Sequence, residues 1–252
     1  MNRDQHAGQP PFLLSEKAVQ VWALYDGEAE ATCQALGHVL SKDERQRANS
    51  YRQIKHQNSF IYRRCVLRWL IGRYLNCKSE SLRFELNPFG KPALLMPDAQ
   101  GFEFSISQTE GLAVLAFAWH CRVGVDVEKL VSDIDINGVG QVVFSGGEQE
   151  AINTSTHDAS SAFFTIWTRK EALLKAVGMG LSGLPSDYLT QDETQHGSNQ
   201  WRALYKGVPL SGWSFLDLEF APCVKGALAV SSDDVQVSLR QFTLLNSRTP
   251  ND

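Results

Sequence analysis

The apolar run LAVLAFAW, Leu112 to Trp119, limits the fold more than any other segment of the chain. A strand that is apolar at every residue is buried on both faces, so it must lie inside a layered structure. The segment VGVDVEK, Val123 to Lys129, follows after three residues and alternates between apolar and polar side chains. Because alternate residues of a strand face opposite sides, Val125 and Val127 should face the core while Asp126 and Glu128 project together on the other face.

The first part of the chain combines a strand with helical segments. The stretch PFLLSEKAVQVWALYD ends in an alternating run that is typical of a strand. Ser41 and Glu44 have the spacing of a capping box, so a helical stretch should begin there and continue to about Asn76. Its second part is apolar at helical spacing, and its arginines are interpreted as a solvated face: Arg63, Arg64, Arg68 and Arg73.

Later segments predict a second, similar half. NPFGKPAL forces a turn that presents Lys91 at a fixed place, and SSAFFTIWTRKEALLKAVGMGL is a helix stopped by glycines. EFSISQTEGLAVLA and LEFAPCVKGALAVS resemble one another as hairpins, and 252 residues are enough for one large domain or two small ones. We therefore predict a mixed α/β (α+β) chain of two halves, residues 1–122 and 123–252.

The acidic pair has two interpretations. Two like charges this close disfavour each other's ionisation, so the pair is costly unless a cation lies between Asp126 and Glu128. Mg²⁺ takes oxygen ligands of this kind, with waters and phosphate oxygens completing its shell. The alternative is a strand edge with two solvated acids, and the pair alone does not decide between them.

The second-half helix favours the functional interpretation. Lys170 falls near the centre of an apolar stripe, where an ammonium is expensive unless an anion or a cavity meets it. Glu171 and Lys175 border the same stripe, one turn apart. By themselves they are an ordinary surface pair worth ~0.2–0.5 kcal/mol. A third carboxylate with two lysines is also what binding a metal-chelated phosphate ester requires.

Charge and composition narrow the function further. The formal net charge of −4 argues against a nucleic-acid-coating protein, so any anion site must be local. The five cysteines are scattered without metal-ligand spacing and are expected to be reduced. The amino terminus lacks a signal-peptide pattern, and the longest apolar run is too short to span a bilayer. We expect a cytoplasmic protein without nucleic-acid or membrane partners.

With these residues identified, the sequence resembles the 4′-phosphopantetheinyl transferases of the larger, two-half type that activates surfactin synthetase and related synthetases. The motifs GVDVE, at Gly124 to Glu128, and WTRKEALLKAVGMGL, at Trp167 to Leu181, carry the resemblance in the expected order. NPFGKP, FSIS and FSGGE fall where the family has its intermediate motifs. The resemblance implies two similar α/β halves in a pseudo-twofold arrangement, with the active site in the cleft between them.

The resemblance also implies an activity and its residues. The reaction would be Mg²⁺-dependent transfer of the phosphopantetheine arm of coenzyme A to a serine of an acyl or peptidyl carrier protein, releasing adenosine 3′,5′-bisphosphate, by a monomer. The carrier would belong to a fatty-acid, polyketide or non-ribosomal peptide synthase. Asp126, Glu128 and Glu171 would ligate the metal, Glu171 would be the general base, and Lys175 would stabilise charge on the leaving group. Contacts to coenzyme A would come from Arg47, Lys91, Pro92, Ser107, Gln108, Asp126, Lys170 and Lys175, and Glu148 would be an additional acid.

Three departures from the family pattern accompany the resemblance. Ser59, Ser105 and Gln108 stand where the family commonly has an arginine, an asparagine and a histidine. Gln keeps a hydrogen-bond donor but supplies no positive charge at the 3′-phosphate. One alternative is therefore a catalytically weakened module that binds carrier proteins with a degenerate coenzyme A site. Another is a metal-dependent phosphoesterase that uses the same acids with water as the nucleophile.

Overall fold

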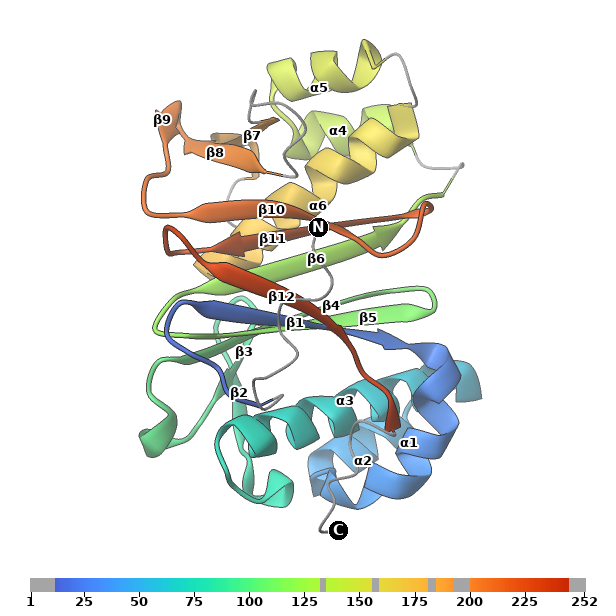
Figure 1. Ribbon diagram of the computed structural model, residues 1–252. Helices are drawn as coiled ribbons and strands as arrows, with labels where there is room; N and C mark the ends of the chain where they lie inside the picture. Colours follow the sequence, from blue (N-terminus) through green and yellow to red (C-terminus); the bar gives the residue numbers. More distant parts are fainter. Residues whose placement is uncertain (1–11, 132–134, 156–158, 181–184, 193–199, 245–252) are drawn as a thin grey trace.

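The computed structural model describes residues 12–131, 135–155, 159–180, 185–192 and 200–244. Two sheets pack face to face at its centre, and a long helix covers the outer face of each, α3 (Ile54–Tyr74) on one side and α6 (Ala159–Val177) on the other (Figure 1). This is the mixed α/β class that the sequence predicts. Among the described residues, no helix is long and apolar enough to cross a membrane.

The first sheet has the strand order β12-β1-β5-β4. Its central strand β5 is the apolar run Leu112–Trp119, which is buried at seven of its eight residues because α3 packs on one face and the second sheet on the other. The elements of this half are β1 (Ala18–Tyr25), α1 (Ala29–Leu36), α2 (Lys42–Asn49), α3 (Ile54–Tyr74), β2 (Phe84–Leu86), β3 (Pro92–Leu94), β4 (Phe102–Thr109) and β5.

The second sheet has the order β10-β11-β6, and α6 packs on β6 and β11. A small sheet, β7-β8-β9, lies beside α6 and contributes Trp201 to the core under that helix. The elements are β6 (Val123–Lys129), α4 (Ile136–Val143), α5 (Gly146–Asn153), α6 (Ala159–Val177), β7 (Tyr188–Asp192), β8 (Trp201–Tyr205), β9 (Val208–Pro209), β10 (Ser214–Glu219), β11 (Val224–Val230) and β12 (Gln236–Gln241).

The last strand does not stay with the second half. β12 pairs in parallel with β1 from Ala18–Gln236 to Ala23–Gln241, so it is an edge strand of the first sheet. Phe242 then packs against Tyr62 and Trp69 of α3. A division at residue 122 therefore places β12 with the second half, whereas its hydrogen bonds and apolar contacts are with the first. The β4–β5 and β10–β11 hairpins form as predicted.

The helical stretch after Ser41 begins as predicted and is then interrupted. Ser41 Oγ accepts from Glu44 N–H at 3.2 Å, and Glu44 Oε2 accepts from Ser41 N–H at 2.8 Å, which completes the capping box. α2 ends at Asn49 and α3 begins at Ile54, so one predicted helix is two, with Tyr51 between them packed on Phe60.

The interpretation of the α3 arginines as a solvated face is wrong for two of them. Arg68 is 2% exposed, and its Nε donates to Glu44 Oε2 at 2.6 Å. The Arg64 Nε donates to the other oxygen of the same carboxylate at 2.7 Å. Because Glu44 is both a helix cap and the anion for two guanidinium groups, it ties α2 to the middle of α3, and these arginines are structural.

Candidate active site

The site lies where the edge strands of the two sheets meet. Three hydroxyl groups of β4 accept hydrogen bonds from three backbone N–H groups of β6: Val125 to Ser105 at 3.1 Å, Val127 to Ser107 at 3.3 Å and Lys129 to Thr109 at 2.9 Å. Unpaired N–H groups on a strand edge need partners, and here side chains of the neighbouring sheet supply them. We call this set of contacts the hydroxyl seam.

Gly124 explains why α6 lies so close to β6. A Cβ on this residue would lie 1.9 Å from the carbonyl oxygen of Ala172 and 2.4 Å from the amide nitrogen of Ala176. Both obstacles are backbone atoms, so no side chain can move away to make room. Sequence reasoning found this glycine only as part of a motif, although an isolated glycine in a strand is a known sign of close backbone approach.

We expect Gly124→Ala to lower the unfolding free energy by ~3 kcal/mol or more, at the upper end of overpacking costs, and to reduce activity because α6 must shift. Urea unfolding and a transfer assay would measure the two effects. Gly147→Ala is the matched control, since nothing lies within 4 Å of its Cβ position. Equal stability of the two variants would contradict this account of Gly124.

The acidic pair lies on the α6 side of β6, as its alternation predicts. Val125 and Val127 are fully buried between the sheets, whereas Asp126 and Glu128 share the face of Gly124. Asp126 is 3% exposed, and its Oδ1 accepts from Ser107 Oγ at 2.7 Å and from Lys175 Nζ at 2.6 Å. Its Oδ2 is buried with no hydrogen-bond partner among the described residues.

Glu171 extends this cluster from α6. Burial and the charge of Asp126 raise its pKa, while Lys175 opposes the shift. Its Oε1 is buried and, among the described residues, has no hydrogen-bond partner. For Glu128, burial first and then Asp126 raise the pKa to about 7. Three carboxyl groups therefore share one ammonium group, and the cluster has an excess of negative charge.

The raised pKa of Glu128 predicts how the stability of the protein depends on pH. The pKa of Glu128 is about 7 in the folded chain and ~4.3 when unfolded, so between these values the folded state binds more protons. The stabilising contribution is fully present below the unfolded pKa and is lost as pH rises through about 7. In metal-free buffer, the melting temperature should fall across this interval, and Glu128→Gln should reduce the slope. An identical slope in the variant would exclude Glu128 as its source.

The donor set fits a hard divalent cation only together with other ligands. In the part of the chain that the structure describes, no group of three His, Cys, Asp or Glu side chains is arranged to hold a metal ion. In the described part of the chain, Asp126 Oδ2 and Glu171 Oε1 are without hydrogen-bond partners, and they lie in one cluster beside the half-buried Glu128. Mg²⁺ commonly takes one or two carboxylates and completes its shell with waters and substrate phosphates. The cluster therefore fits Mg²⁺ that arrives with a phosphate ligand.

A cavity of about 400 Å³ lies at one end of the seam. The first half contributes Lys91, Pro92 and Arg122, and the second contributes the end of α6. Lys91 Nζ donates to the carbonyl oxygen of Val123 at 3.2 Å and lies 3.5 Å from Glu103 Oε2, and burial lowers its pKa. Two basic side chains, Lys91 and Arg122, thus line a cavity that is large enough for part of a small-molecule ligand.

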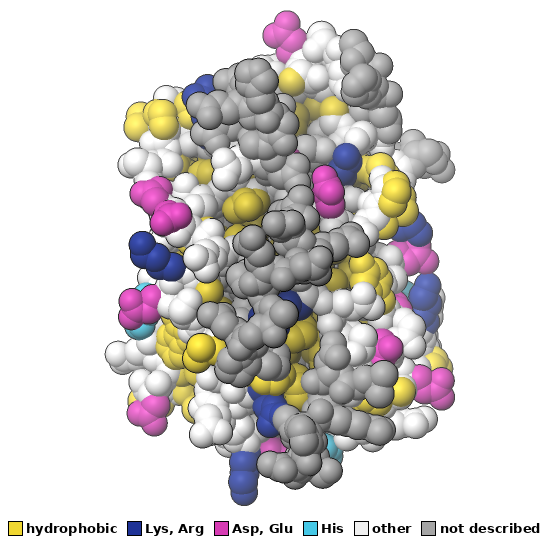
Figure 2. All heavy atoms as spheres, viewed as in Figure 1, with side chains coloured by type: hydrophobic (Ala, Val, Ile, Leu, Met, Phe, Trp, Pro, Cys, Tyr) yellow, Lys and Arg dark blue, Asp and Glu magenta, His cyan; other side chains and the backbone are white. Residues whose placement is uncertain are grey.

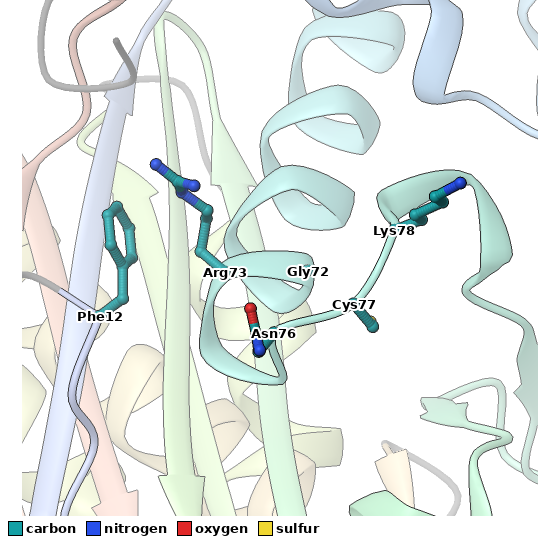
Figure 3. A pocket seen from close by; sticks show the side chains of 6 residues that line it. All are labelled: Phe12, Gly72, Arg73, Asn76, Cys77 and Lys78. Atoms are coloured by element: carbon teal, nitrogen blue, oxygen red, sulfur yellow. The ribbon is translucent and has the colours of Figure 1, made fainter. Parts of the chain in front are cut away.

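Another cavity, of about 390 Å³, lies at the end of α3 and is separate from these residues. Figure 3 shows Arg73 directed toward Phe12, with its Cζ 5.3 Å from the ring centroid, and Lys78 pointing away. None of the predicted site residues lines it; its lining is Phe12, Gly72, Arg73, Asn76, Cys77 and Lys78. On the face in Figure 2, acidic and basic side chains are interspersed. The candidate site is therefore the charged cluster at the seam.

Lys170 is buried as its position in the stripe predicts, but its partner is not a ligand. It is 1% exposed, lies 2.9 Å from Glu148 Oε2, and donates to the carbonyl oxygens of Pro185, at 2.8 Å, and Tyr188. Glu148 also caps α5 and accepts from Thr190 N–H at 3.0 Å. All three donors of the ammonium are used inside the second half, which argues against the predicted contact with coenzyme A and gives Glu148 a structural role.

The other predicted residues are only partly brought together. Ser107 contacts Asp126, but its hydroxyl proton is used by that carboxylate. Gln108 is exposed and alternates to the opposite face of β4 from the seam. Arg47 is exposed on α2, with its Cζ 5.5 Å from the Phe60 ring centroid. Ser59 accepts from Arg63 Nη1 at 2.7 Å, so a guanidinium group lies close to this departure from the family pattern. Leu181, at the end of the second motif, lies outside the described residues.

Comparison with known proteins identifies the family. The model of the 4′-phosphopantetheinyl transferase superfamily matches residues 122–236. The 4′-phosphopantetheinyl transferase HetI of a Nostoc species is 30% identical over 213 residues, which are 83% of this chain and 86% of the relative. The transferase gsp of Aneurinibacillus migulanus is 28% identical over 162 residues, 64% and 65% of the two chains. L-aminoadipate-semialdehyde dehydrogenase-phosphopantetheinyl transferase of Rattus norvegicus is 24% identical over 239 residues, 82% and 76%.

The fold, the carboxylate cluster beside the hydroxyl seam and these relatives define a transferase. The chain belongs to the 4′-phosphopantetheinyl transferase superfamily, and it is an enzyme of the holo-[carrier protein] synthase type. Coenzyme A is the substrate that this family uses. The recognition of the family from GVDVE and WTRKEALLKAVGMGL is thereby confirmed.

Proposed function

We propose that this protein transfers the 4′-phosphopantetheine arm of coenzyme A to a serine hydroxyl of an acyl or peptidyl carrier protein. The serine oxygen forms a bond to the phosphorus that bears the arm, and the bond from that phosphorus to the bridging oxygen breaks. Adenosine 3′,5′-bisphosphate leaves. The observation that carries the proposal is the cluster of Asp126 and Glu171 beside Lys175, in which Asp126 Oδ2 and Glu171 Oε1 are buried and have no hydrogen-bond partner among the described residues.

The residues have complementary tasks in this reaction. Asp126, Glu128 and Glu171 would hold Mg²⁺ together with phosphate oxygens of coenzyme A, and the ion would neutralise charge at the pyrophosphate. Glu171 is also the candidate general base for the serine proton, because its Oε1 is buried in the cluster and has no hydrogen-bond partner among the described residues. Lys175 lies at the same cluster and stabilises the negative charge on the leaving phosphate. Transfer at phosphorus depends mainly on such positioning and charge stabilisation.

The cavity beside the seam gives coenzyme A its orientation. Lys91 and Arg122 line that cavity and are placed to receive the phosphates of the nucleotide part, while Lys175 and Glu171 lie further along α6. The arm then points toward the carboxyl end of β6, where Glu128 is half-buried and the carrier serine would enter. Arg47 and Gln108 remain proposed contacts to coenzyme A, and the pseudo-twofold relation of the two halves remains a prediction.

The test is a mass-shift assay on a panel of apo carrier proteins of the fatty-acid, polyketide and peptide types, with coenzyme A and Mg²⁺. The expected result is a carrier that gains the mass of one phosphopantetheine arm, with no gain when the metal is chelated. No gain on any carrier would overturn the proposal. Carrier binding without transfer would favour the weakened binding module, and steady coenzyme A hydrolysis without a carrier would favour the phosphoesterase.

We further propose that the protein acts as a monomer in the cytoplasm. A single chain supplies both walls of the cavity, since Lys91 and Arg122 come from the first half and the end of α6 comes from the second. Light scattering at assay concentrations would test the state of assembly. A stable dimer that loses activity on dilution would contradict it.

A further inference from the structure

The loop between β2 and β3 owes its shape to one side chain. Asn87 Oδ1 accepts hydrogen bonds from the N–H groups of Phe89 and Lys91, each at 2.9 Å. The backbone of Asn87 also accepts from Gly90 N–H and donates to the carbonyl oxygen of Lys91, both at 2.9 Å. Asparagine commonly folds a turn in this way, and the result here is a fixed position for the backbone of Lys91.

The amide nitrogen of the same side chain reaches into the second half. Asn87 Nδ2 donates to the carbonyl oxygen of Gly178 at 2.8 Å, directly after the last residue of α6. Because two N–H groups face Oδ1, the amide has only one orientation that satisfies both of its ends. Carbonyl groups at a helix end have no partner within the helix, so Asn87 supplies one. The other hydrogen bonds described at the candidate site between the first half and the second end on β6, whereas this one ends at the end of α6.

We propose that Asn87 is a positioning residue that fixes the loop carrying Lys91 relative to the catalytic helix α6. The inference rests on the proposed function, in which the cavity receives the nucleotide part of coenzyme A. Asn87 and Lys91 line one wall of that cavity, and Gly178 lines the other. Lys175 lies three residues before Gly178, so the link sets the distance from the bound nucleotide to the groups that act on the phosphorus. A misplacement of ~1 Å can cost about 10²-fold in rate.

Two substitutions test the hydrogen bond from Asn87 to Gly178 separately from the turn that Asn87 folds. Asn87→Asp and Asn87→Ser both keep a side-chain oxygen that can accept from the loop N–H groups, and both remove the Nδ2 group that donates to Gly178 O. An ionised Asp has no proton to donate, and the Ser hydroxyl is one bond closer to the backbone than Nδ2. They differ in charge, so a defect confined to Asn87→Asp would indicate repulsion of the substrate and overturn the proposal. The expected result for both is a kcat about 10²-fold lower, with the Kd for adenosine 3′,5′-bisphosphate changed less than about threefold. Unchanged kcat with weakened nucleotide binding would show that Asn87 only shapes the loop.

A second measurement does not depend on transfer. Gly178 N–H and Met179 N–H both donate to the carbonyl oxygen of Leu174, at 2.9 and 3.2 Å, and close the end of α6. In Asn87→Ser, hydrogen exchange of these amides should be about fivefold faster, as expected for loss of one hydrogen bond worth ~1 kcal/mol. Unchanged exchange would overturn the link to α6 even if the enzyme is active. Faster exchange with no transfer by the unaltered protein would instead overturn the proposed function and leave the link.

Discussion

Glu171→Gln is expected to lower kcat by about 10³-fold, within the range for loss of a general base, while the melting temperature and nucleotide affinity change little. The amide has nearly the same shape but cannot take the serine proton, and it is a weaker ligand for a hard cation. Glu171 Oε1 lacks a hydrogen-bond partner among the described residues, so the substitution breaks no contact described there for that oxygen. Single-turnover kinetics with a saturating carrier would measure the chemical step.

The matched control is Glu150→Gln, which makes the same chemical change on the exposed surface of α5. It should keep the activity of the unaltered protein. If Glu171→Gln keeps more than about a tenth of the original kcat, Glu171 is neither the base nor an essential metal ligand. A large loss in both variants would point to a general effect of charge instead.

Lys170→Met is expected to have the largest effect on stability. It leaves Glu148 buried, at 5% exposure, without its cation, and breaking a buried ion pair commonly costs about 3–5 kcal/mol. The two carbonyl groups that accept from Lys170 also lose their donor. Urea unfolding should show this loss, and the melting temperature should fall by roughly 10 °C, at ~2–4 °C per kcal/mol for a chain of this size.

Two further variants make the stability result specific. Lys206→Met removes an exposed lysine whose partner Asp187 lies 3.6 Å away, and it should leave the urea unfolding midpoint nearly unchanged. Adding Glu148→Gln to Lys170→Met should recover part of the loss, because the uncompensated buried charge disappears. Recovery should be incomplete, since Glu148 also caps α5 and binds Thr190. A Lys170→Met protein as stable as the Lys206→Met control would refute the structural role of the pair.

Local patterns predicted much of the fold because their causes are local. The capping box at Ser41, the apolar β5 and the alternating β6 each follow from residues within one segment, and each is confirmed. The crossing of β12 to β1 depends on contacts between residues more than 200 positions apart, and no short window contains that information. The break between α2 and α3 was missed because the residues that separate the two helices, Ser50 to Gln53, include no proline or glycine.

In the candidate site too, local features could be predicted from the sequence and long-range contacts could not. The sequence identified Asp126 and Glu128 as a pair on one face, and Lys170 as an ammonium that needs an anion. It could not tell that the anion is Glu148, because that pairing depends on how α5 docks beside α6. Asn87 was noticed only as part of a turn. Its contact with Gly178 joins positions 91 residues apart and is visible only in three dimensions.

The hydroxyl seam has a consequence for how this chain can change in length. Ser105, Ser107 and Thr109 meet β6 because they alternate with Phe104, Ile106 and Gln108, which face the other way. Inserting or deleting a single residue within β4 would exchange these two sets and turn the apolar side chains toward the catalytic acids. Insertions and deletions should therefore be tolerated at the ends of β4 and eliminated by selection inside it.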